Sequence, residues 1–396
     1  TYFEGLKIMS KFVQLHLLTS YPPSNLNRDD TGRPKTALVG DAARLRVSSQ
    51  SQKRAWRFSD VFKDHLPASE ELIGKRTKRI GLEWIYTKLV AKGVPVDTAR
   101  SWSKEIQRAY GEPESEADDN PDSVLINGQL AHISPVEREK LSSFVSSLAD
   151  YLLHGTANEL VESAETAIKK RDKAKEKKKA NAALARDLAE MLLVRKSTAV
   201  DIALFGRMLA AVPAFNFDAA VQVSHAITVH KATVEDDYFS AVDDLNKGLE
   251  DKGAGHIGER GYGAGLFYLY ICIDRELLRE NLGGDEVLTG KALEALMHSV
   301  TKVSPTGMQN SHASRAYASY VLAEKGNQQP RSLAQAFLKP VKPFEDEDMF
   351  EKSVKAITTR YENFDKVYGA CAEARYEINV EKGKGSLEEL VTFVKE

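Results

Sequence analysis

The sequence has little of what stabilises small secreted proteins or spans a membrane. Its 396 residues include only two cysteines, so a disulfide framework is excluded. Cys272 lies in the apolar run LFYLYICI, where we expect a buried thiol, and this cysteine usage favours a reducing, cytoplasmic compartment. No apolar run reaches the roughly eighteen residues of a membrane span. The short segment LHLL does not resemble a secretory signal, so we predict a cytoplasmic protein without a membrane partner.

The motifs of common catalysts are missing as well. There is no nucleophile elbow, phosphate loop or kinase signature, and no Cys or carboxylate cluster has the spacing of a zinc or iron site. His225 and His230 fall on opposite faces if their segment is a strand. We therefore expect no cofactor, no metal and no enzyme. The alternative is a metal-dependent α+β nuclease that uses His225 or the acid pairs Asp29–Asp30 and Asp243–Asp244.

Positive charge is concentrated in two places although the formal net charge of the chain is only -2. Residues 28–57 hold eight Lys or Arg and three Asp, and residues 169–179 hold eight Lys or Arg and two acids. The rest of the chain is acidic. Two basic segments on an acidic body favour a defined track for a polyanion over a loose electrostatic coat.

Periodicity predicts a mixed chain that begins with a strand over residues 11–19, followed by a turn-rich loop. Residues 44–48 alternate, which places Arg44, Arg46 and Ser48 on one outer face of a strand. A helix capped by Ser49 or Ser51 is expected to follow and to end near Phe62. Residues 66–200 read as mostly helical, strands return at 199–208, 220–230 and 266–274, and residues 235–265 form a polar, glycine-rich arm.

The basic segment around the predicted helix has the chemistry of a phosphate site. A helix N-terminus presents unpaired N–H groups to an anion, and serine hydroxyls lie beside it. Gln50, Lys53 and Arg57 are spaced to share one helix face, while Trp56 and Phe62 can pack inward. A solvated basic helix face with a serine cap is the alternative. For residues 169–179 the alternatives are a solvated helix and nonspecific contact with a nucleic-acid backbone.

The motifs NLNRDD, RLRVSSQSQKRAWR, DIALFGRM, VSHAITVH, DDYFSAVDDL, GHIG and ENLGG occur in this order along about two-thirds of the chain. In this combination the sequence resembles the CasC family, the crRNA-binding backbone subunits of type I-E CRISPR Cascade complexes. The resemblance implies an α+β fold with an RRM-like or ferredoxin-like palm, a large helical fingers insertion and a long thumb hairpin. It also implies a subunit without catalytic activity.

The resemblance further implies how such a subunit works. Several copies form a helical filament along one crRNA, and the thumb of each copy kinks the RNA at intervals. The bases between the kinks then pair with target DNA in antiviral defence. The implied partners are crRNA, target DNA, other copies of the chain, and the large, small, cap and crRNA-processing subunits of Cascade.

Carried onto this chain, the resemblance predicts the domain limits. Independently of the resemblance, we expect residues 1–8, TYFEGLKI, to be a tag or an upstream extension before Met9. The palm takes residues 9–62, 201–229 and 266–396 with C-terminal helices, the fingers take 63–200, and the thumb takes 230–265.

The resemblance also assigns the site residues. Those expected to bind RNA are Arg28, Lys35, Arg46, Ser48, Gln50, Ser51, Lys53, Arg54, Arg57, Met208, Gln309 and Asn310. Met208 is expected to act as a wedge beside the displaced nucleotide. Tyr238, Phe239 and Ile257 of the thumb are expected to flank the kinked step, and the candidates for DNA contact are Lys169, Lys170, Lys173 and Lys177.

Overall fold

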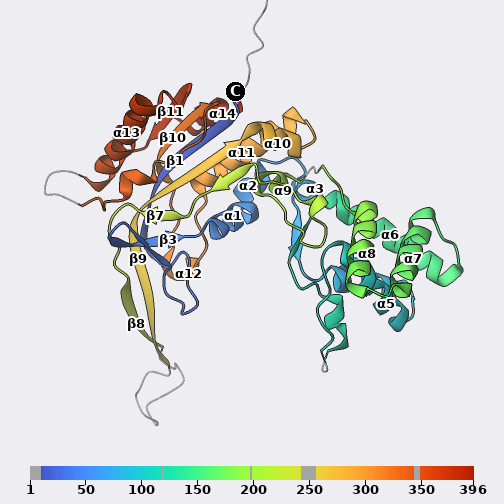
Figure 1. Ribbon diagram of the computed structural model, residues 1–396. Helices are drawn as coiled ribbons and strands as arrows, with labels where there is room; N and C mark the ends of the chain where they lie inside the picture. Colours follow the sequence, from blue (N-terminus) through green and yellow to red (C-terminus); the bar gives the residue numbers. More distant parts are fainter. Residues whose placement is uncertain (1–9, 118–119, 197–198, 242–255, 343–347) are drawn as a thin grey trace, which may run out of the picture. The chain divides into compact units, whose positions relative to one another are not determined.

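A computed structural model describes residues 10–117, 120–196, 199–241, 256–342 and 348–396. The predicted tag, residues 1–8, lies outside this part of the chain. The chain divides into two compact units. The sheet unit comprises the residues up to Leu66 with Val221–Glu276 and Gly290–Glu396, and the helical unit comprises Pro67–Ala220 and Leu277–Thr289. The predicted α+β class is confirmed, with the strands concentrated in the sheet unit (Figure 1).

The sheet unit is built on one antiparallel sheet with the strand order β11-β10-β1-β9-β7-β3-β2, and β6 and β8 also pair with β9. The two long central strands pair over the whole apolar part of β1, from Phe12 opposite Asp274 to Thr19 opposite Phe267. The RRM-like description of this sheet remains a prediction. The strands are β1 (Phe12–Ser24), β2 (Thr36–Val39), β3 (Ala42–Val47), β6 (Val221–Val223), β7 (Ala226–Thr228), β8 (Glu235–Ala241), β9 (His256–Asp274), β10 (Ala318–Gly326) and β11 (Ala374–Asn379).

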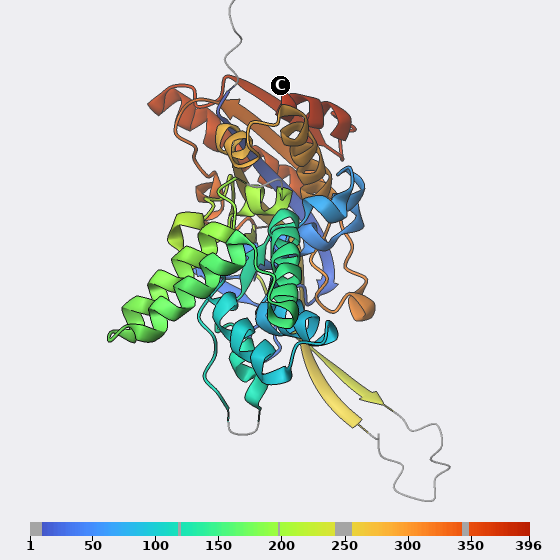
Figure 2. The same ribbon diagram turned by 90° about the vertical axis from the view of Figure 1, so that its right-hand side faces the viewer.

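Side chains alternate between two buried faces of this sheet, because successive residues of a strand point to opposite sides. Leu18 of β1 packs with Tyr268, Tyr320 and residues of α13 on one face. Helix α13 lies on this side of the sheet, and α1 and α11 lie on the other (Figures 1 and 2). The helices that carry residues of the sheet unit are α1 (Ser49–Phe58), α2 (Asp60–Asp64), α10 (Arg275–Asn281), α11 (Glu286–Lys302), α12 (Gln309–His312), η5 (Ala334–Phe337), α13 (Met349–Tyr368) and α14 (Leu387–Lys395).

Strand β9 extends beyond the ends of the strands that flank it in the centre of the sheet. Its C-terminal half pairs with β1, β6 and β7, whereas among the described residues its N-terminal part pairs only with β8, from Glu235 opposite Tyr262 to Ala241 opposite His256. The two strands leave the sheet as a hairpin (Figure 1). The hairpin is the predicted arm, and residues 242–255, which include Asp243 and Asp244, lie outside the described residues.

The helical unit has its own apolar core, in which Leu141, Leu148, Leu184 and Leu188 are fully or almost fully buried. Helices α7 and α8 are antiparallel neighbours within it (Figure 2). The elements of this unit are α3 (Ser69–Leu72), β4 (Lys75–Thr77), η1 (Ile80–Tyr86), α4 (Thr87–Ala91), α5 (Val96–Ile106), η2 (Gln107–Ala109), η3 (Pro121–Leu125), β5 (Ala131–Ile133), α6 (Pro135–His154), α7 (Glu159–Lys173), α8 (Lys177–Leu192), α9 (Val200–Phe205) and η4 (Pro213–Phe215).

Two predicted elements are wrong. Residues 199–208 contain helix α9 instead of a strand, and every residue from Val200 to Phe205 is buried. A short apolar run that is buried on all sides has no periodicity that separates helix from strand. The helix predicted to reach Phe62 ends at Phe58, because Ser59 caps a second helix by accepting a hydrogen bond from the backbone N–H of Phe62.

Within the described ranges, no helix combines the length and the apolar character that crossing a bilayer requires.

Candidate nucleic-acid interface

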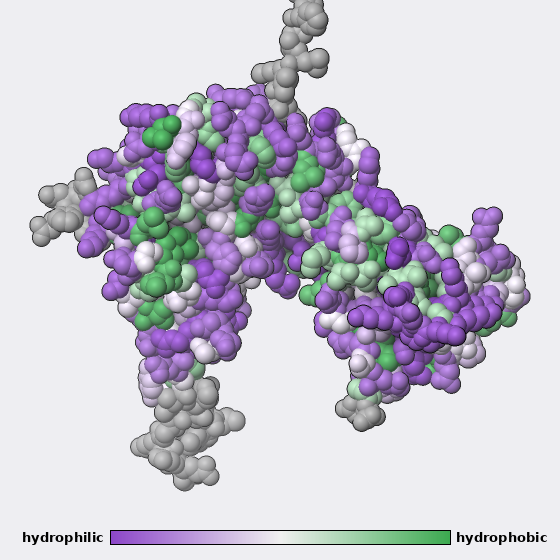
Figure 3. Space-filling view, in the orientation of Figure 1, coloured by the Kyte–Doolittle hydropathy of each residue, from purple (hydrophilic) through white to green (hydrophobic). Residues whose placement is uncertain are grey.

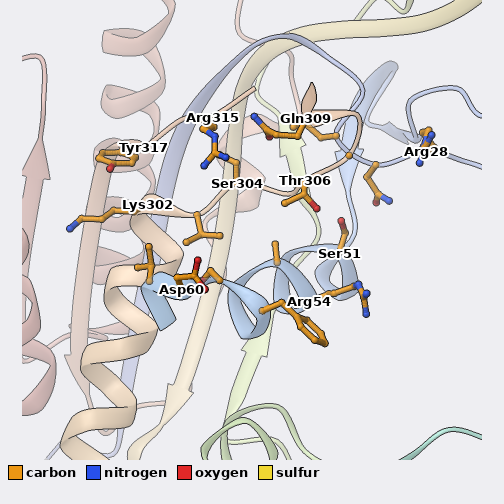
Figure 4. A pocket seen from close by; sticks show the side chains of 18 of the residues that line it. Arg28, Ser51, Arg54, Asp60, Lys302, Ser304, Thr306, Gln309, Arg315 and Tyr317 are labelled. Carbon is orange, nitrogen blue, oxygen red and sulfur yellow. The ribbon is translucent and has the colours of Figure 1, made fainter. Parts of the chain in front are cut away.

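Three segments of the sheet unit enclose an open groove with a volume of about 1220 Å³. One wall is formed by α1 and the start of α2, the opposite wall by the loop that follows α11, and residues 26–32 close one end (Figure 4). Arg28, Ser51, Arg54 and Gln309, which the sequence placed in an RNA site, all line this groove. The structure therefore gathers candidates that are up to 281 positions apart in the printed sequence.

Helix α1 lines the groove with one side, from Ser51 to Phe58, and is capped by Ser48. The Ser48 hydroxyl accepts a hydrogen bond from the backbone N–H of Ser51 at 3.3 Å, so the cap is neither Ser49 nor Ser51 as predicted. Ser51 and Arg54 lie one turn apart on the groove side. The Ser51 hydroxyl and the Arg54 guanidinium together suit an anion.

The basic residues of the segment RLRVSSQSQKRAWR, residues 44–57, do not all reach solvent. Arg44 is completely buried and donates hydrogen bonds to the carbonyl oxygens of Thr228 and Phe337, so the predicted basic outer face of β3 is wrong at this position. Arg57 is also buried, whereas Gln50 and Arg54 are exposed and Lys53 is half-buried. As predicted, Trp56 and Phe62 point into the core.

The NLNRDD segment is a loop held by its own polar side chains. Asn25 is buried and donates to the carbonyl oxygens of Gly32 and Gly261, and Asn27 accepts from the backbone N–H of Ser48 at 2.9 Å. A hydrogen bond from the Thr31 hydroxyl and backbone N–H groups of the loop lower the pKa of the Asp29 carboxyl. These bonds leave Arg28 exposed at the end of the groove (Figure 4).

The opposite wall is a loop pinned at its base. The Ser304 hydroxyl accepts from the backbone N–H of Ala316 at 3.0 Å and donates to its carbonyl oxygen at 3.1 Å. A Cβ atom at Gly307 would lie 2.2 Å from the carbonyl oxygen of Leu26, so glycine lets this loop meet the NLNRDD loop. The predicted Gln309 lines the groove, and the neighbouring Asn310 is exposed but does not line it.

Sequence reasoning missed several groove residues. Lys302 and Arg315 add positive charge from the second wall, and Tyr317 adds an aromatic ring that is 67% exposed. Neither cation belongs to a basic cluster in the sequence, so charge counting had no signal for them. The acids Asp29, Asp30 and Asp60 also line the groove, which limits its positive potential to a few anion contacts.

Arg46 of β3 and Lys35, which directly precedes β2, form a second basic group together with His225. The Arg46 guanidinium lies 2.6 Å from Nδ1 of His225, and the backbone N–H of Arg46 donates to the carbonyl oxygen of Lys35. Burial and the nearby charges of Arg46 and Lys35 lower the pKa of His225. Because its close neighbours are cations, His225 is poorly placed to ligate a metal for a nuclease.

Met208 of the helical unit is 75% exposed, although its neighbours are fixed. Arg207 forms a fully buried ion pair with Glu137, at 2.6 Å, and exchanges two backbone hydrogen bonds with Phe217. The backbone N–H of Leu209 donates to the side chain of Asn216. Met208 is therefore a flexible apolar side chain that lies in solvent on a rigid backbone, as a wedge requires.

The arm exposes one aromatic side chain and covers another. Tyr238 is 67% exposed, while the Phe239 ring is half-buried and lies 4.5 Å from the Arg260 guanidinium. Ile257 pairs with Ser240 in the hairpin, and its side chain lies outside the described part of the structure. An ion pair of 2.8 Å between Arg33 and Asp236 ties the hairpin to the NLNRDD loop.

The lysine-rich segment is the turn of a helical hairpin and not one helix. Helix α7 ends at Lys173 and α8 begins at Lys177. Lys177 donates to the carbonyl oxygens of Arg171 and Asp172 at the end of α7, and Lys169 pairs with Glu165 at 3.0 Å. Lys170 and Lys173 are exposed on the same hairpin.

The chain is similar to known proteins over almost its whole length. The family model described as "CT1975-like protein" matches residues 13–392. A solved chain from a "CRISPR RNA-guided surveillance complex, pre-nicking" is 26% identical, with a TM-score of 0.74, and the match covers 97% of this chain and 99% of that one. A chain from a "CRISPR RNA-guided surveillance complex" is 24% identical, with a TM-score of 0.64 and the same coverage. No curated protein matches the sequence.

Proposed function

We propose a function from one premise: the chain belongs to the CT1975-like protein family. It is a crRNA-binding subunit of a CRISPR surveillance complex of the Cascade kind. We further propose that it is the backbone subunit of a type I-E complex, that several copies follow one crRNA and kink it at intervals, and that the exposed bases pair with target DNA. It has no catalytic activity of its own in this scheme.

The groove is the observation that carries the proposal. Arg28, Arg54, Lys302 and Arg315 reach it from three separate segments, and the hydroxyl-bearing Ser51, Ser304 and Thr306 line it too. A groove with a few cations and hydroxyls suits a small number of phosphates on a single strand. Tyr317 and Phe58 also line it and offer rings that accept any base or ribose without reading sequence.

Met208 and Tyr238 support the kinking part of the proposal. Both are large, exposed and apolar in part, and each sits on a backbone that is fixed by hydrogen bonds. An apolar side chain inserted between bases stabilises an unstacked step without base specificity. Their roles as wedge and thumb contacts rest on the family resemblance together with this exposure.

Apolar surface on the sheet unit supports assembly with other protein chains. An apolar area interrupts the polar surface near the point where the hairpin leaves the sheet (Figure 3). Leu38 and Tyr368 of this unit are 78% and 77% exposed. Exposed apolar area of this kind marks protein–protein contacts, which other copies of the chain and other Cascade subunits would supply.

The test is RNA retention by groove variants. The chain is expressed with a CRISPR array and the partner subunits, and the purified particle is analysed by its absorbance ratio at 260 and 280 nm and by a denaturing gel. Reversing two groove charges, in the double variant Arg54→Glu and Arg315→Glu, should reduce the bound RNA several-fold, because two phosphate contacts become repulsions.

The matched control is Lys355→Glu with Lys366→Glu. Both lysines are exposed on α13, on the other side of the sheet, and this variant makes the same change in net charge. Wild type and control should retain one RNA species of uniform length. Equal RNA retention by the groove variant and the control would show that the groove does not hold the RNA.

A further inference from the structure

We propose that His65, Glu294 and His298 form a binding site for a divalent transition-metal ion such as Zn²⁺. One potential ligand atom from each of these side chains lies within 4.8 Å of the other two. All three are half-buried residues of the sheet unit, outside the set that lines the groove. His65 and His298 are 233 positions apart, so no spacing in the sequence indicates this trio.

His65 is oriented by a hydrogen bond that prepares its other nitrogen for a metal. It follows α2 directly, and its Nδ1 lies 2.7 Å from the carbonyl oxygen of Val61. A carbonyl oxygen only accepts, so Nδ1 carries the proton and Nε2 keeps its lone pair. This arrangement, with one ring nitrogen donating to a backbone carbonyl, is the usual support of a metal-bound histidine.

The other two residues come from one face of α11. Glu294 and His298 are four positions apart, so they are neighbours on the helix surface. The His298 ring stacks on that of His65 with 3.7 Å between centroids and an angle of 29°, so the two rings must turn apart for their in-plane lone pairs to meet at one ion. Two imidazoles and one carboxylate match the ligand set of three-residue zinc sites, which leave a fourth position open. Two imidazoles also favour Zn²⁺, Ni²⁺ or Co²⁺ over Mg²⁺ or Ca²⁺.

Three lysines contact Glu294 or His298 and compete with the ion for these ligands, so they lower its expected affinity. Lys395 and Lys291 lie 2.7 and 3.2 Å from Oε2 of Glu294, so Oε1 is the oxygen left for a metal. Lys302 lies 3.4 Å from Nδ1 of His298. A metal on Nε2 of His298 requires the proton on Nδ1, and this proton cannot coexist with a hydrogen bond donated by Lys302. Metal binding therefore displaces Lys302 from His298.

Displacement of Lys302 from His298 would affect the groove as well as the metal site. Lys302 lines the groove, and Asp60 and Val61 of α2 line it too. An ion at the trio would join α2 to α11 and direct the Lys302 ammonium toward the groove. If the groove binds RNA as proposed above, the Lys302 ammonium directed toward the groove strengthens the binding of RNA. Bound RNA then strengthens the binding of the ion by the same factor, because coupling between two sites is reciprocal.

The decisive experiment measures metal binding without RNA, so its outcome is independent of the proposed function. The full chain without an affinity tag is treated with a chelator, and Zn²⁺ is titrated by calorimetry. Co²⁺ is then added, and its visible absorption reports a tetrahedral site. We expect one ion per chain and a loss of affinity of about tenfold or more in His65→Ala and in His298→Ala. Lys302→Gln should bind more tightly than wild type.

The control is His154→Ala, which removes an exposed histidine of the helical unit and should leave binding unchanged. Far-ultraviolet circular dichroism and a thermal melt establish that each variant is folded. The proposal is overturned if the folded wild type binds neither ion, or if removal of His65 and of His298 affects binding no more than removal of His154.

Discussion

Glu324 is a buried carboxylate that contacts three basic side chains of the sheet unit: the buried His16 and the partly exposed Arg331 and Arg375. It contacts Arg331 and Arg375 through both oxygens and accepts a hydrogen bond from Nε2 of His16 at 3.2 Å. Burial alone raises the pKa of Glu324, but the bonds from His16 and Arg331 outweigh burial and hold it below its usual range. The side chain is therefore ionised at neutral pH and neutralises the cations around it.

Removing this charge should destabilise the protein severely. Glu324→Gln removes the fully buried partner that Arg331 and Arg375 share and leaves Asp365 as their remaining countercharge. Because both guanidinium groups are partly exposed, we expect a loss toward the lower end of the about 3–5 kcal/mol for a broken buried pair. The free energy of unfolding in urea is the measurement. The surface carboxylate Glu377, which pairs with the exposed Lys384, provides the control, because Glu377→Gln should change stability by less than about 1 kcal/mol. Similar effects of the two substitutions would contradict the role of Glu324.

His16 makes the stability depend on pH through the same network. Burial lowers the pKa of His16, although Glu324 raises it, so the ring stays neutral in the folded protein. Nε2–H then donates to Glu324, and Nδ1 accepts from the Tyr268 hydroxyl at 2.8 Å. A folded-state pKa below the unfolded value gives stability that is present above the unfolded pKa and is lost as pH falls through the folded one.

We therefore expect the wild type to lose stability on acidification relative to His16→Gln, which keeps a donor but cannot titrate. Between about pH 7.5 and pH 5.5 the difference should grow by about 1.4 kcal/mol for each pH unit below the unfolded pKa of about 6.5. Urea unfolding at several pH values measures it. Parallel pH profiles for the two proteins would show that His16 does not titrate between the folded and unfolded states.

At the scale of elements, two adjacent residues of the segment 206–217 have different roles: we expect Arg207 to stabilise the fold and Met208 to bind RNA. Arg207 makes the buried ion pair with Glu137, whereas Met208 is exposed. We expect Met208→Ala to change the free energy of unfolding by less than about 0.5 kcal/mol. The same substitution should alter the regular nuclease protection of bound crRNA, because the apolar wedge is lost.

Leu130→Ala is the matched control for that footprint. Leu130 is an exposed apolar residue of the helical unit and lies outside every predicted site. Protection by this variant should equal that of the wild type. A Met208→Ala footprint that cannot be distinguished from the Leu130→Ala footprint would contradict the wedge.

Helix faces that differ in solvent contact were predictable, whereas short segments buried on all sides were not reliably so. The inward-facing Trp56 and Phe62 follow from the solvent contrast between helix faces, so the sequence encodes them locally. Strand β1 is buried on both faces from Val13 to Leu18 and was still predicted, whereas α9 was not. Helix α9 has no exposed face, and only tertiary packing selects its conformation. A serine cap was expected at the start of α1. Which of the three serines caps the helix depends on their backbone angles, which the periodicity of the sequence does not predict.

The groove was predictable in part: its α1 wall, Arg28 at one end, and Gln309 of the opposite wall. Ser51 and Arg54 belong to a dense basic motif, and this motif also led to the family resemblance, which is confirmed. Lys302 and Arg315 reach the same groove because Gly307 allows their loop to approach Leu26. Such a close approach of two backbones, far apart in sequence, leaves no pattern in a single chain. For the same reason the trio of His65, Glu294 and His298 had no sequence signal.

At the scale of the whole molecule, positive charge is divided between two units that can be tested separately. The groove cations belong to the sheet unit, and Lys170 and Lys173 belong to the helical unit. We expect Lys170→Ala with Lys173→Ala to leave crRNA retention unchanged while weakening the binding of target DNA by the assembled complex. The salt dependence of DNA binding should also become shallower, by about 0.7 to 0.9 per lost phosphate contact.

Filter binding of target DNA at several salt concentrations provides the measurement. Lys355→Ala with Lys366→Ala removes the same charge from the sheet unit and serves as the control. If the hairpin lysines behave like these two, they are solvated surface charges and the DNA contact lies elsewhere.

The length of β9 has a mechanical consequence. The hairpin with β8 and the central pairing with β1 share this one strand. A pull on the hairpin along the strand axis loads the β1–β9 ladder in shear, so its hydrogen bonds, which lie across the strands, resist together instead of opening one at a time. Tension applied through the arm is thus carried into the middle of the sheet, where the strand is held on both sides. The arm would bend or lose its own pairing with β8 before it could be torn from the body of the protein.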